Sequence, residues 1–336
     1  MVSPFLEPMT FIQRLGNQLF HYGIIFGFDY ADRKQFEYVR KYFGQDIPDP
    51  FDINRERSAL AIINSHIVTH GVWPSYQNLV EVGGIHCKPA KELPENLKTY
   101  MDAHPEGVVY VSFGSALKPS QMATEQKMVF INAFRELKNT PIIWKWDDVL
   151  DEIPENVLVQ KWLPQNDLLA HPNLRVFVTH GGLLSTQEAL FHKVPLVGVP
   201  ISNDQYPNMI RAEANGYAKM LHLQTMTKDN LVLAIQTAFN DKQVLNSIQK
   251  MHDLFTDYHF GGSPLERAVS AIDLVVKHKG ADFLKPKAIM SMSWYQVHGY
   301  DIFALFVFVI ALFSWLMFKL CSCCLRRCFV TKAKQE

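Results

Sequence analysis

The stretch VFVTHGGLLSTQEAL (Val176–Leu190) decides the fold class and also points to a ligand site. Its apolar, β-branched start predicts a strand ending at His180, the two glycines predict a tight turn, and Ser185 is expected to open a helix. Glycines let a ligand approach the backbone, and a helix N-terminus presents unpaired N–H groups. The stretch therefore predicts a diphosphate seat, although an ordinary turn between a strand and a helix has the same pattern.

Strands and helices alternate on both sides of this turn. Strands are expected at residues 107–115, 141–146, 156–162, 174–180 and 194–200, and helices at 185–192 and 207–215. A further helix is indicated by four residues that share one helical face: Phe130, Ile131, Phe134 and Leu137. Buried strands that alternate with amphipathic helices form a parallel sheet covered on both faces, so the predicted fold class is α/β, with a Rossmann-like domain over residues 107–280. In such sheets ligands bind at the carboxyl ends of the strands.

The segment before this alternation is predicted to be the end of a domain, residues 1–84. Phe11–Tyr30 is rich in aromatic residues and is expected to be helical. Ser58–Val68 is expected to be a buried strand, with no obvious partner strand before it. Two glycines and two prolines within Gly83–Leu97 indicate an inter-domain linker, placed at residues 85–106.

Charge and motif content exclude several classes of function. The 33 basic side chains balance the 33 acidic ones, so no overall field attracts the chain to nucleic acid. The sequence lacks both the G-x-G-x-x-G pattern of dinucleotide oxidoreductases and the G-x-x-x-x-G-K-[ST] pattern of P-loop proteins. Recognition must therefore come from a local site of another kind.

Residues Ile302–Phe318 predict a transmembrane helix, placed at residues 301–320. The segment contains no charged side chain and is bounded by Asp301 and Lys319. A buried core helix is the alternative, but only a basic tail follows. By the positive-inside tendency this tail, residues 321–336, is expected in the cytoplasm and the body of the chain in the lumen.

Both ends of the chain bear on its topology. Residues 1–17 show no basic segment followed by an apolar one, so no signal peptide is recognised, and we expect a truncated product or an unusual topology. A juxtamembrane segment, residues 281–300, precedes the predicted transmembrane helix. Four of the five cysteines lie in the tail, where their C-x-C-C-x₃-C spacing favours acylation over a zinc site.

Polar and aromatic side chains gather at other predicted strand ends. Trp162 and Gln165 follow one strand, and an indole beside a phosphate seat suits stacking on a base, whereas a tryptophan next to a strand is more often core. Glu188 lies one helical turn into the helix after the glycines, where it could accept hydrogen bonds from ribose hydroxyls or be a solvated charge. Asp204 and Gln205 follow the next strand and could hold sugar hydroxyls, or Asp204 could cap a helix.

The order and spacing of these segments resemble the UDP-glycosyltransferase family, which includes the UDP-glucuronosyltransferases. The family signature runs from W-[LIV]-P-Q through T-H-[GC]-G and an acidic residue to a D-Q pair. This chain reads WLPQ at 162–165, THGG at 179–182, QE at 187–188 and DQ at 204–205. VVYVSFGS resembles the first strand of the family's donor domain, and HCKPAKELP resembles its linker. The resemblance extends over nearly the whole chain.

The resemblance implies a GT-B enzyme whose carboxyl domain binds the UDP-sugar and whose amino domain binds a small lipophilic acceptor. It implies an inverting transfer of a hexosyl or glucuronosyl group without metal or cofactor, since the UDP-sugar is a co-substrate. Carried over by position, Trp162 stacks on uracil, Gln165 contacts the nucleoside and Glu188 holds the ribose. The implied diphosphate contacts are Ser115, His180, Gly182 and Ser185, and the implied sugar contacts are Asp204 and Gln205.

Three departures from the family pattern bear on function. Leu184 stands where many relatives have Asn or Gly, which removes a polar phosphate contact. Ile63 stands where glucuronate-using relatives often carry Arg, which favours a neutral sugar such as glucose. The histidine that acts as catalytic base in the family is expected to precede residue 1, so residues 1–84 are expected to be a remnant of the acceptor domain. The chain alone is then expected to transfer sugar slowly or not at all.

Alternatives to an enzyme remain open at this point. The chain could be a non-catalytic membrane protein that binds UDP-sugar or pairs with full-length relatives, or an unrelated α/β membrane protein with another phosphate ligand. The expected partners are a UDP-sugar, a small lipophilic acceptor, the bilayer and related transferases in a homo- or hetero-oligomer. Lys332 and Lys334 have the spacing of the retrieval signal that holds relatives in the endoplasmic reticulum, or belong to a stop-transfer charge cluster.

Overall fold

The computed structural model describes residues 8–49, 58–114, 122–148, 152–258, 261–285, 287–297 and 299–332. The chain divides into two compact units. The first consists of Met1–Asp46 and Leu60–Lys279, and the second consists of Ile47–Ala59 and Gly280–Glu336.

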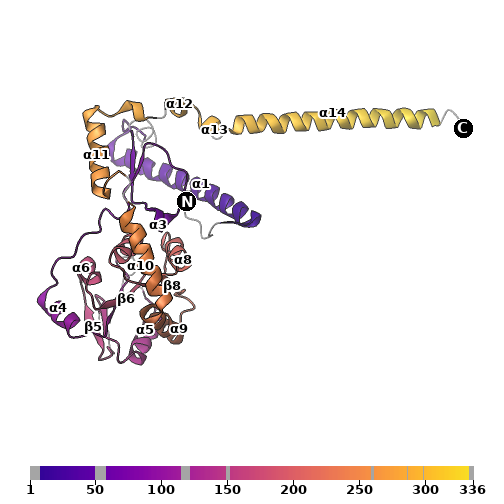
Figure 1. The fold of residues 1–336 in the computed structure, drawn as a ribbon. Coiled ribbons are helices and arrows are strands. Elements are labelled where there is room, and N and C mark those ends of the chain that lie inside the picture. Colours follow the sequence, from indigo (N-terminus) through magenta and orange to yellow (C-terminus); the bar gives the residue numbers. More distant parts are fainter. Residues whose placement is uncertain are drawn as a thin grey trace. The chain divides into compact units, whose positions relative to one another are not determined.

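The first unit alternates strands and helices through most of its length (Figure 1). Its strands are β1 (Ala61–Ile63), β2 (Leu79–Glu81), β3 (Val108–Ser112), β4 (Ile142–Lys145), β5 (Val157–Gln160), β6 (Leu174–Thr179), β7 (Leu196–Gly198) and β8 (Ala218–Met220). Its helices are α1 (Phe11–Phe43), α3 (Ile67–His70), α4 (Glu95–Asp102), α5 (Thr124–Glu136), α6 (Gln165–Leu169), α7 (Leu183–Phe191), α8 (Gln205–Ala214), α9 (Lys228–Asn240), α10 (Lys242–Asp257) and α11 (Pro264–Lys277). Each strand expected between residues 107 and 200 is present, and the α/β fold class is confirmed.

Six parallel strands form the main sheet, in the order β5-β4-β3-β6-β7-β8. Numbered along the chain, this order is third, second, first, fourth, fifth and sixth. From β3 the chain first adds β4 and β5 on one side, and then returns to add β6, β7 and β8 on the other side. The strand order therefore reverses between β3 and β6. In doubly wound sheets ligands bind in the crevice at this reversal, beyond the carboxyl ends of the two strands. The predicted diphosphate seat directly follows β6, so it lies at the reversal point.

Alternating side chains of the central strands fill two apolar layers, one on each face of the sheet. On one face Val109 and Val111 of β3 pack with residues of α5 and α9. On the other face Val108 and Tyr110 pack with residues of α7, α8 and α10. A strand covered on both faces is apolar throughout, which explains why VVYVS lacks polar alternation. The four residues predicted to share a helical face are all buried in the first layer: Phe130, Ile131, Phe134 and Leu137.

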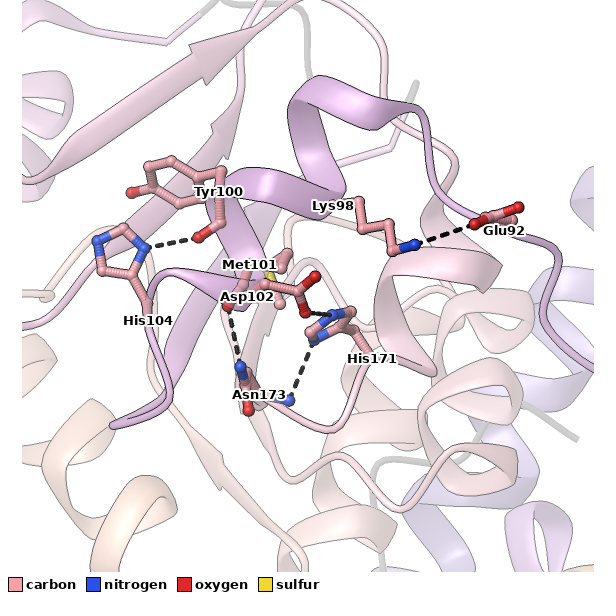
Figure 2. Close-up of polar contacts among 8 residues, drawn as sticks. All are labelled: Glu92, Lys98, Tyr100, Met101, Asp102, His104, His171 and Asn173. Carbon is pink, nitrogen blue, oxygen red and sulfur yellow. Dashed lines mark hydrogen bonds and ion pairs between the residues drawn. The ribbon is translucent and has the colours of Figure 1, made fainter.

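Helix α4 holds the segment before β3 against the loop that leads into β6 (Figure 2). Met101 is fully buried, and its carbonyl accepts from Asn173 Nδ2 at 2.9 Å. His171 Nδ1 accepts from the backbone N–H of Asn173 at 3.2 Å, so Nε2 carries the proton and donates to Asp102 Oδ1 at 3.2 Å. Both ring nitrogens of His171 thus have partners, and the Asp102–His171 contact joins α4 to the loop before β6. Residues 85–106, predicted as a linker, thus include a helix packed on the sheet domain.

The prediction of one buried strand over Ser58–Val68 is wrong. Only Ala61–Ile63 form a strand, which is exposed to half-buried, and Ile67–His70 form a short helix. The partner of this strand is β2, which follows it in the chain and pairs with it in parallel. A short apolar run does not distinguish a strand from a strand followed by a helical turn, and this ambiguity is the reason for the error.

The first helix is longer than predicted. It begins at Phe11 as expected, where Thr10 and Gln13 form a capping box, but it continues to Phe43 instead of ending at Tyr30. No glycine or proline interrupts the chain between Tyr30 and Gly44, and Gly44 is the residue that ends the helix. The prediction placed the end of the helix where the aromatic-rich stretch ends, whereas the helix continues until it meets a helix-breaking residue.

The second unit carries the apolar helix. After η2 (Asp282–Leu284), α12 (Lys287–Met290) and α13 (Trp294–Val297), the long helix α14 covers Tyr300–Lys332 (Figure 1). Among the described residues, its part Tyr300–Ser322 is a candidate membrane span, with a mean hydropathy of 2.4. The second predicted retrieval lysine, Lys334, lies outside the described residues.

Candidate functional site

The glycine turn after β6 packs closely around His180. Helix α7 begins two residues before Ser185, with Gly182 in the N-cap position, so the predicted start of this helix is wrong. Gly182 has the extended backbone of an N-cap residue but no side chain that could accept a hydrogen bond. The prediction from sequence relied on a polar residue at the start of the helix, and it therefore chose Ser185. Gly181 has a φ of +79°, and a Cβ there would overlap the side chain of Met209. A Cβ on Gly182 would lie 2.7 Å from His180 Nε2, so both positions require glycine.

His180 is a buried, neutral imidazole directly after β6, two residues before the N-cap of α7. Burial lowers its pKa, the positive charge of Lys145 lowers it further, and the carboxylate of Asp204 acts in the opposite direction. The ring is therefore uncharged at neutral pH and offers one N–H donor and one acceptor. A neutral donor beside the free N–H groups of a helix N-terminus suits an anionic ligand.

Gln165 connects three elements at the site. As the first residue of α6, it donates from Nε2 to Ser185 Oγ at 3.0 Å and to Glu188 Oε2 at 2.6 Å, both on α7. Its Oε1 accepts from the hydroxyl of Tyr110 on β3 at 3.3 Å. Three residues of the predicted site are thereby brought together across separate elements. The amide fixes the position of the Glu188 carboxylate.

Trp162 lies two residues beyond the end of β5 and is exposed. Its side chain is 71% exposed, whereas the next residue, Leu163, is buried. This exposure excludes the interpretation of Trp162 as a core residue. An exposed indole a few residues before Gln165 presents a flat apolar face on which a base can stack.

The start of α8 forms a further side of the site. Asn208 Nδ2 donates to Asp204 Oδ2 and to the carbonyl of Gly181, each at 3.0 Å. Asp204 occupies the N-cap position of α8, as the alternative interpretation expected, but its side chain makes no cap hydrogen bond to the helix. Gln205 Oε1 accepts from two backbone N–H groups of its own loop, at 2.8 and 3.0 Å. The oxygen of Gln205 therefore supports the loop.

The remaining predicted residues are placed as follows. Ser115 lies outside the described residues. Leu184 is exposed in the first turn of α7, and His86 Nε2 donates to its carbonyl at 3.1 Å. Ile63 is the last residue of β1 and is half-buried.

Three residues at this edge of the sheet were missed by the sequence reasoning. Tyr110 brings a phenol hydroxyl into the middle of a buried strand, and Lys145 breaks the apolar run IIWKW at its carboxyl end. Both irregularities are visible in the sequence and could have drawn attention to these residues. Asn208 lies one helical turn after Asp204, a spacing that allows side chains on a helix to meet.

Comparison with known proteins gives relatives along the whole chain. A family model described as "UDP-glucoronosyl and UDP-glucosyl transferase" matches residues 1–335. UDP-glycosyltransferase UGT5 of Dactylopius coccus is 36% identical over 90% of this chain and 57% of its own length. UDP-glucuronosyltransferase 2B7 of Homo sapiens is 30% identical over 100% of this chain and 62% of its own length. The chain thus spans less than two thirds of the length of these relatives.

A solved structure supports the fold. The spinosyn forosaminyltransferase SpnP matches with a TM-score of 0.50 and 16% sequence identity, covering 61% of this chain and 52% of that chain. This likeness concerns the fold alone, which is of the GT-B type. The family model extends over all but the last residue, and the THGG segment follows β6, one of the two strands at the reversal point of the sheet. The chain belongs to the UDP-glucuronosyl and UDP-glucosyl transferase family.

Proposed function

We propose that this chain carries the donor site of a UDP-glycosyltransferase, which transfers a hexosyl or glucuronosyl group from a UDP-sugar to a small lipophilic acceptor. Family membership supports transfer from a UDP-sugar. The observation that carries the proposal is the hydrogen-bonded group of Gln165, Ser185 and Glu188 beside the glycine turn. That group lies at the reversal point, where sheets of this type bind ligands.

Each part of the site suits one part of a UDP-sugar. Trp162 stacks on the uracil, and Glu188, oriented by Gln165, accepts hydrogen bonds from the ribose hydroxyls. His180 and the free N–H groups at the start of α7 hold the diphosphate. Asp204, held by Asn208, accepts from hydroxyls of the sugar. Base, diphosphate and sugar are thus assigned to the segments that follow β5, β6 and β7, in the order in which these strands lie across the sheet.

The proposed reaction is an inverting displacement. The acceptor oxygen attacks the anomeric carbon from the side opposite to UDP, and the bond between that carbon and the β-phosphate oxygen breaks. The electron pair of this bond remains on UDP, and the acceptor proton passes to a general base. The His180 N–H and the start of α7 offset the negative charge that develops on UDP, so the proposed reaction needs no metal ion. No residue of this chain is assigned the role of the base.

Calorimetry on the full chain in detergent tests the proposed donor site. UDP is expected to bind with a 1:1 stoichiometry, and the Kd should agree within about twofold between buffers that contain Mg²⁺ and buffers that contain EDTA. ADP is the control ligand, since it has the same diphosphate but a different base. Absence of UDP binding would reject the donor site, and a strong Mg²⁺ requirement would reject only the metal-free part.

We further propose that α14 anchors the chain in the endoplasmic reticulum membrane, with the first unit in the lumen. The candidate span at Tyr300–Ser322 and the basic residues after it support this orientation. Changing Lys332 and Lys334 to serine should let a reporter that carries this anchor leave the endoplasmic reticulum, as followed by glycan maturation. Unchanged retention would reject the retrieval signal and leave a stop-transfer charge cluster.

A further inference from the structure

Helix α6 carries Gln165, yet it is only five residues long, Gln165–Leu169. An isolated helix of that length is not stable in water, so contacts with neighbouring elements must fix its place. Leu168 and Leu169 supply apolar contacts, because both are buried in the layer of α7. The other three residues of α6 are polar, and each has a hydrogen-bond partner outside the helix.

The partners of α6 on α7 lie along one stripe. Gln165 donates to Ser185 and Glu188. Asn166 Oδ1 lies 3.0 Å from Nε2 of His192, the C-cap residue of α7. Ser185, Glu188 and His192 are three and four positions apart, and residues with this spacing share one face of a helix. Helix α6 therefore holds α7 at both of its ends, and Glu188 lies between the two points of contact.

The direction of the hydrogen bond between Asn166 and His192 follows from Asp167. A carboxylate only accepts, and Asp167 Oδ1 lies 3.2 Å from Asn166 Nδ2. The amide nitrogen of Asn166 therefore faces Asp167, and the amide oxygen faces His192, whose Nε2 must carry the proton and donate. Asp167 Oδ1 also accepts from the backbone N–H of Lys91 at 2.9 Å, which joins α6 to the segment before α4.

His192 is neutral at physiological pH. Burial lowers its pKa to about 4, the carboxylate of Asp167 acts in the opposite direction, and His252 lowers the pKa further. A neutral ring carries a proton on only one nitrogen, so the single N–H of His192 is used on Asn166. His252 contacts the same end of α7 in another way, because its Nδ1 donates to the carbonyl of Leu190 at 3.0 Å. That bond joins α7 to α10 and does not involve α6.

We propose that His192 is a positioning residue for ribose recognition, which acts through Asn166 on the first turn of α6. This inference rests on the proposed function of the site. Gln165 precedes Asn166 directly, and its amide donates to the Glu188 carboxylate at 2.6 Å. Without the bond to His192, the first turn of α6 loses its tie to the end of α7, so the amide orients the carboxylate less firmly. A less oriented carboxylate loses more conformational entropy when it binds a ligand.

Calorimetry with UDP and 2′-deoxyuridine diphosphate tests this role in the full chain. His192→Phe keeps an aromatic ring and removes the N–H. The preference for UDP over the deoxy ligand should fall by about three- to tenfold, the range that one hydrogen bond commonly accounts for. Affinity for the deoxy ligand should change by less than about twofold, because that ligand lacks the 2′-hydroxyl. His192→Gln, whose amide can donate to Asn166, should keep most of the preference.

A double-mutant cycle tests whether His192 acts through Asn166. Asn166→Ala removes the same hydrogen bond from its other end, so it should lower the preference for UDP by a similar factor. The double variant should lose little more than either single variant, since residues that share one contact are not additive. If His192→Phe does not fold, Asn166→Ala takes its place in the comparison of the two ligands.

His252→Phe is the matched control. It removes another histidine hydrogen bond from the same end of α7 but leaves α6 untouched. The variant should prefer UDP over the deoxy ligand as the unchanged protein does, even where its unfolding temperature falls. Thermal unfolding followed by circular dichroism measures the stability of every variant, so a loss of stability is separated from a loss of preference.

The possible outcomes separate this inference from the proposed function. If the unchanged protein shows no preference for UDP, or if the preference persists in both His192→Phe and Asn166→Ala, the positioning role is overturned while UDP binding still supports the donor site. An equal loss in His252→Phe also overturns it. If the unchanged protein binds no UDP, the proposed function fails and the inference fails with it. A loss in His192→Phe that is absent from His192→Gln and His252→Phe supports the inference.

Discussion

Replacing Trp162 by alanine is expected to weaken UDP binding by at least tenfold. The indole is 71% exposed in the free protein, so its removal leaves no cavity in the core. Stacking of a base on an aromatic side chain is worth ~1–3 kcal/mol, and about 1.4 kcal/mol corresponds to a factor of ten in Kd. Trp162→Phe, which keeps a smaller aromatic face, should lose less affinity. Calorimetry with UDP measures both variants.

A second exposed tryptophan provides the control for this prediction. Trp73 is 40% exposed, lies before β2, and donates from Nε1 to Glu81 at 2.9 Å. Trp73→Ala should leave the affinity for UDP unchanged. Uridine should follow the same order of affinities as UDP in the Trp162 variants, because both ligands carry the base. An alanine variant of Trp162 with unchanged affinity for UDP would falsify the stacking role.

Replacing Glu188 by alanine is expected to weaken UDP binding by about ten- to a hundredfold, because hydrogen bonds to a charged group contribute ~1.5–3 kcal/mol each. In the free protein the carboxylate is held by Gln165 Nε2 at 2.6 Å, so it is oriented before the ligand binds. An oriented acceptor loses less conformational entropy on binding than a free side chain. The loss should be confined to ligands with ribose hydroxyls.

Deoxyribose ligands test whether Glu188 contacts the ribose. The unchanged protein should bind UDP more tightly than 2′-deoxyuridine diphosphate, and Glu188→Ala should bind the two with similar affinity. Glu125→Ala serves as the control, since Glu125 is an exposed acidic residue in the first turn of α5. If Glu188→Ala still prefers UDP over 2′-deoxyuridine diphosphate as the unchanged protein does, the Glu188 carboxylate does not contact the 2′-hydroxyl of the ribose.

The central sheet could be predicted from the sequence because its strands are covered on both faces. β3, β4, β5, β6 and β7 are apolar runs bounded by glycine, proline or asparagine, and such runs are visible without tertiary information. The strand order could not be read in the same way, because it depends on which strands pair across the fold. The partner of β1 was missed for this reason: β2 is a three-residue strand with half-buried side chains.

The candidate site was predicted as a set of residues but not as a network. The segments around Trp162, His180 and Asp204 stand at strand ends that the hydrophobic pattern locates. The hydrogen bonds from Gln165 to α7 join residues 20 and 23 positions apart, and such contacts depend on packing between elements. Side chains that enter the site from the middle or the end of a buried strand, Tyr110 and Lys145, were hidden by the expectation that buried strands hold only core residues.

The parallel register of the sheet makes the site more sensitive to insertions and deletions than to many substitutions. Lys145 reaches its face of the sheet only because Trp144 occupies the other one. One extra residue inside β4 would turn the lysine toward the layer of α5 and α9 and bring the bulky indole to the ligand side. An extra residue after α11 would leave every strand end where it is. Variation in chain length is therefore least tolerated within the short strands that precede the ligand-facing turns.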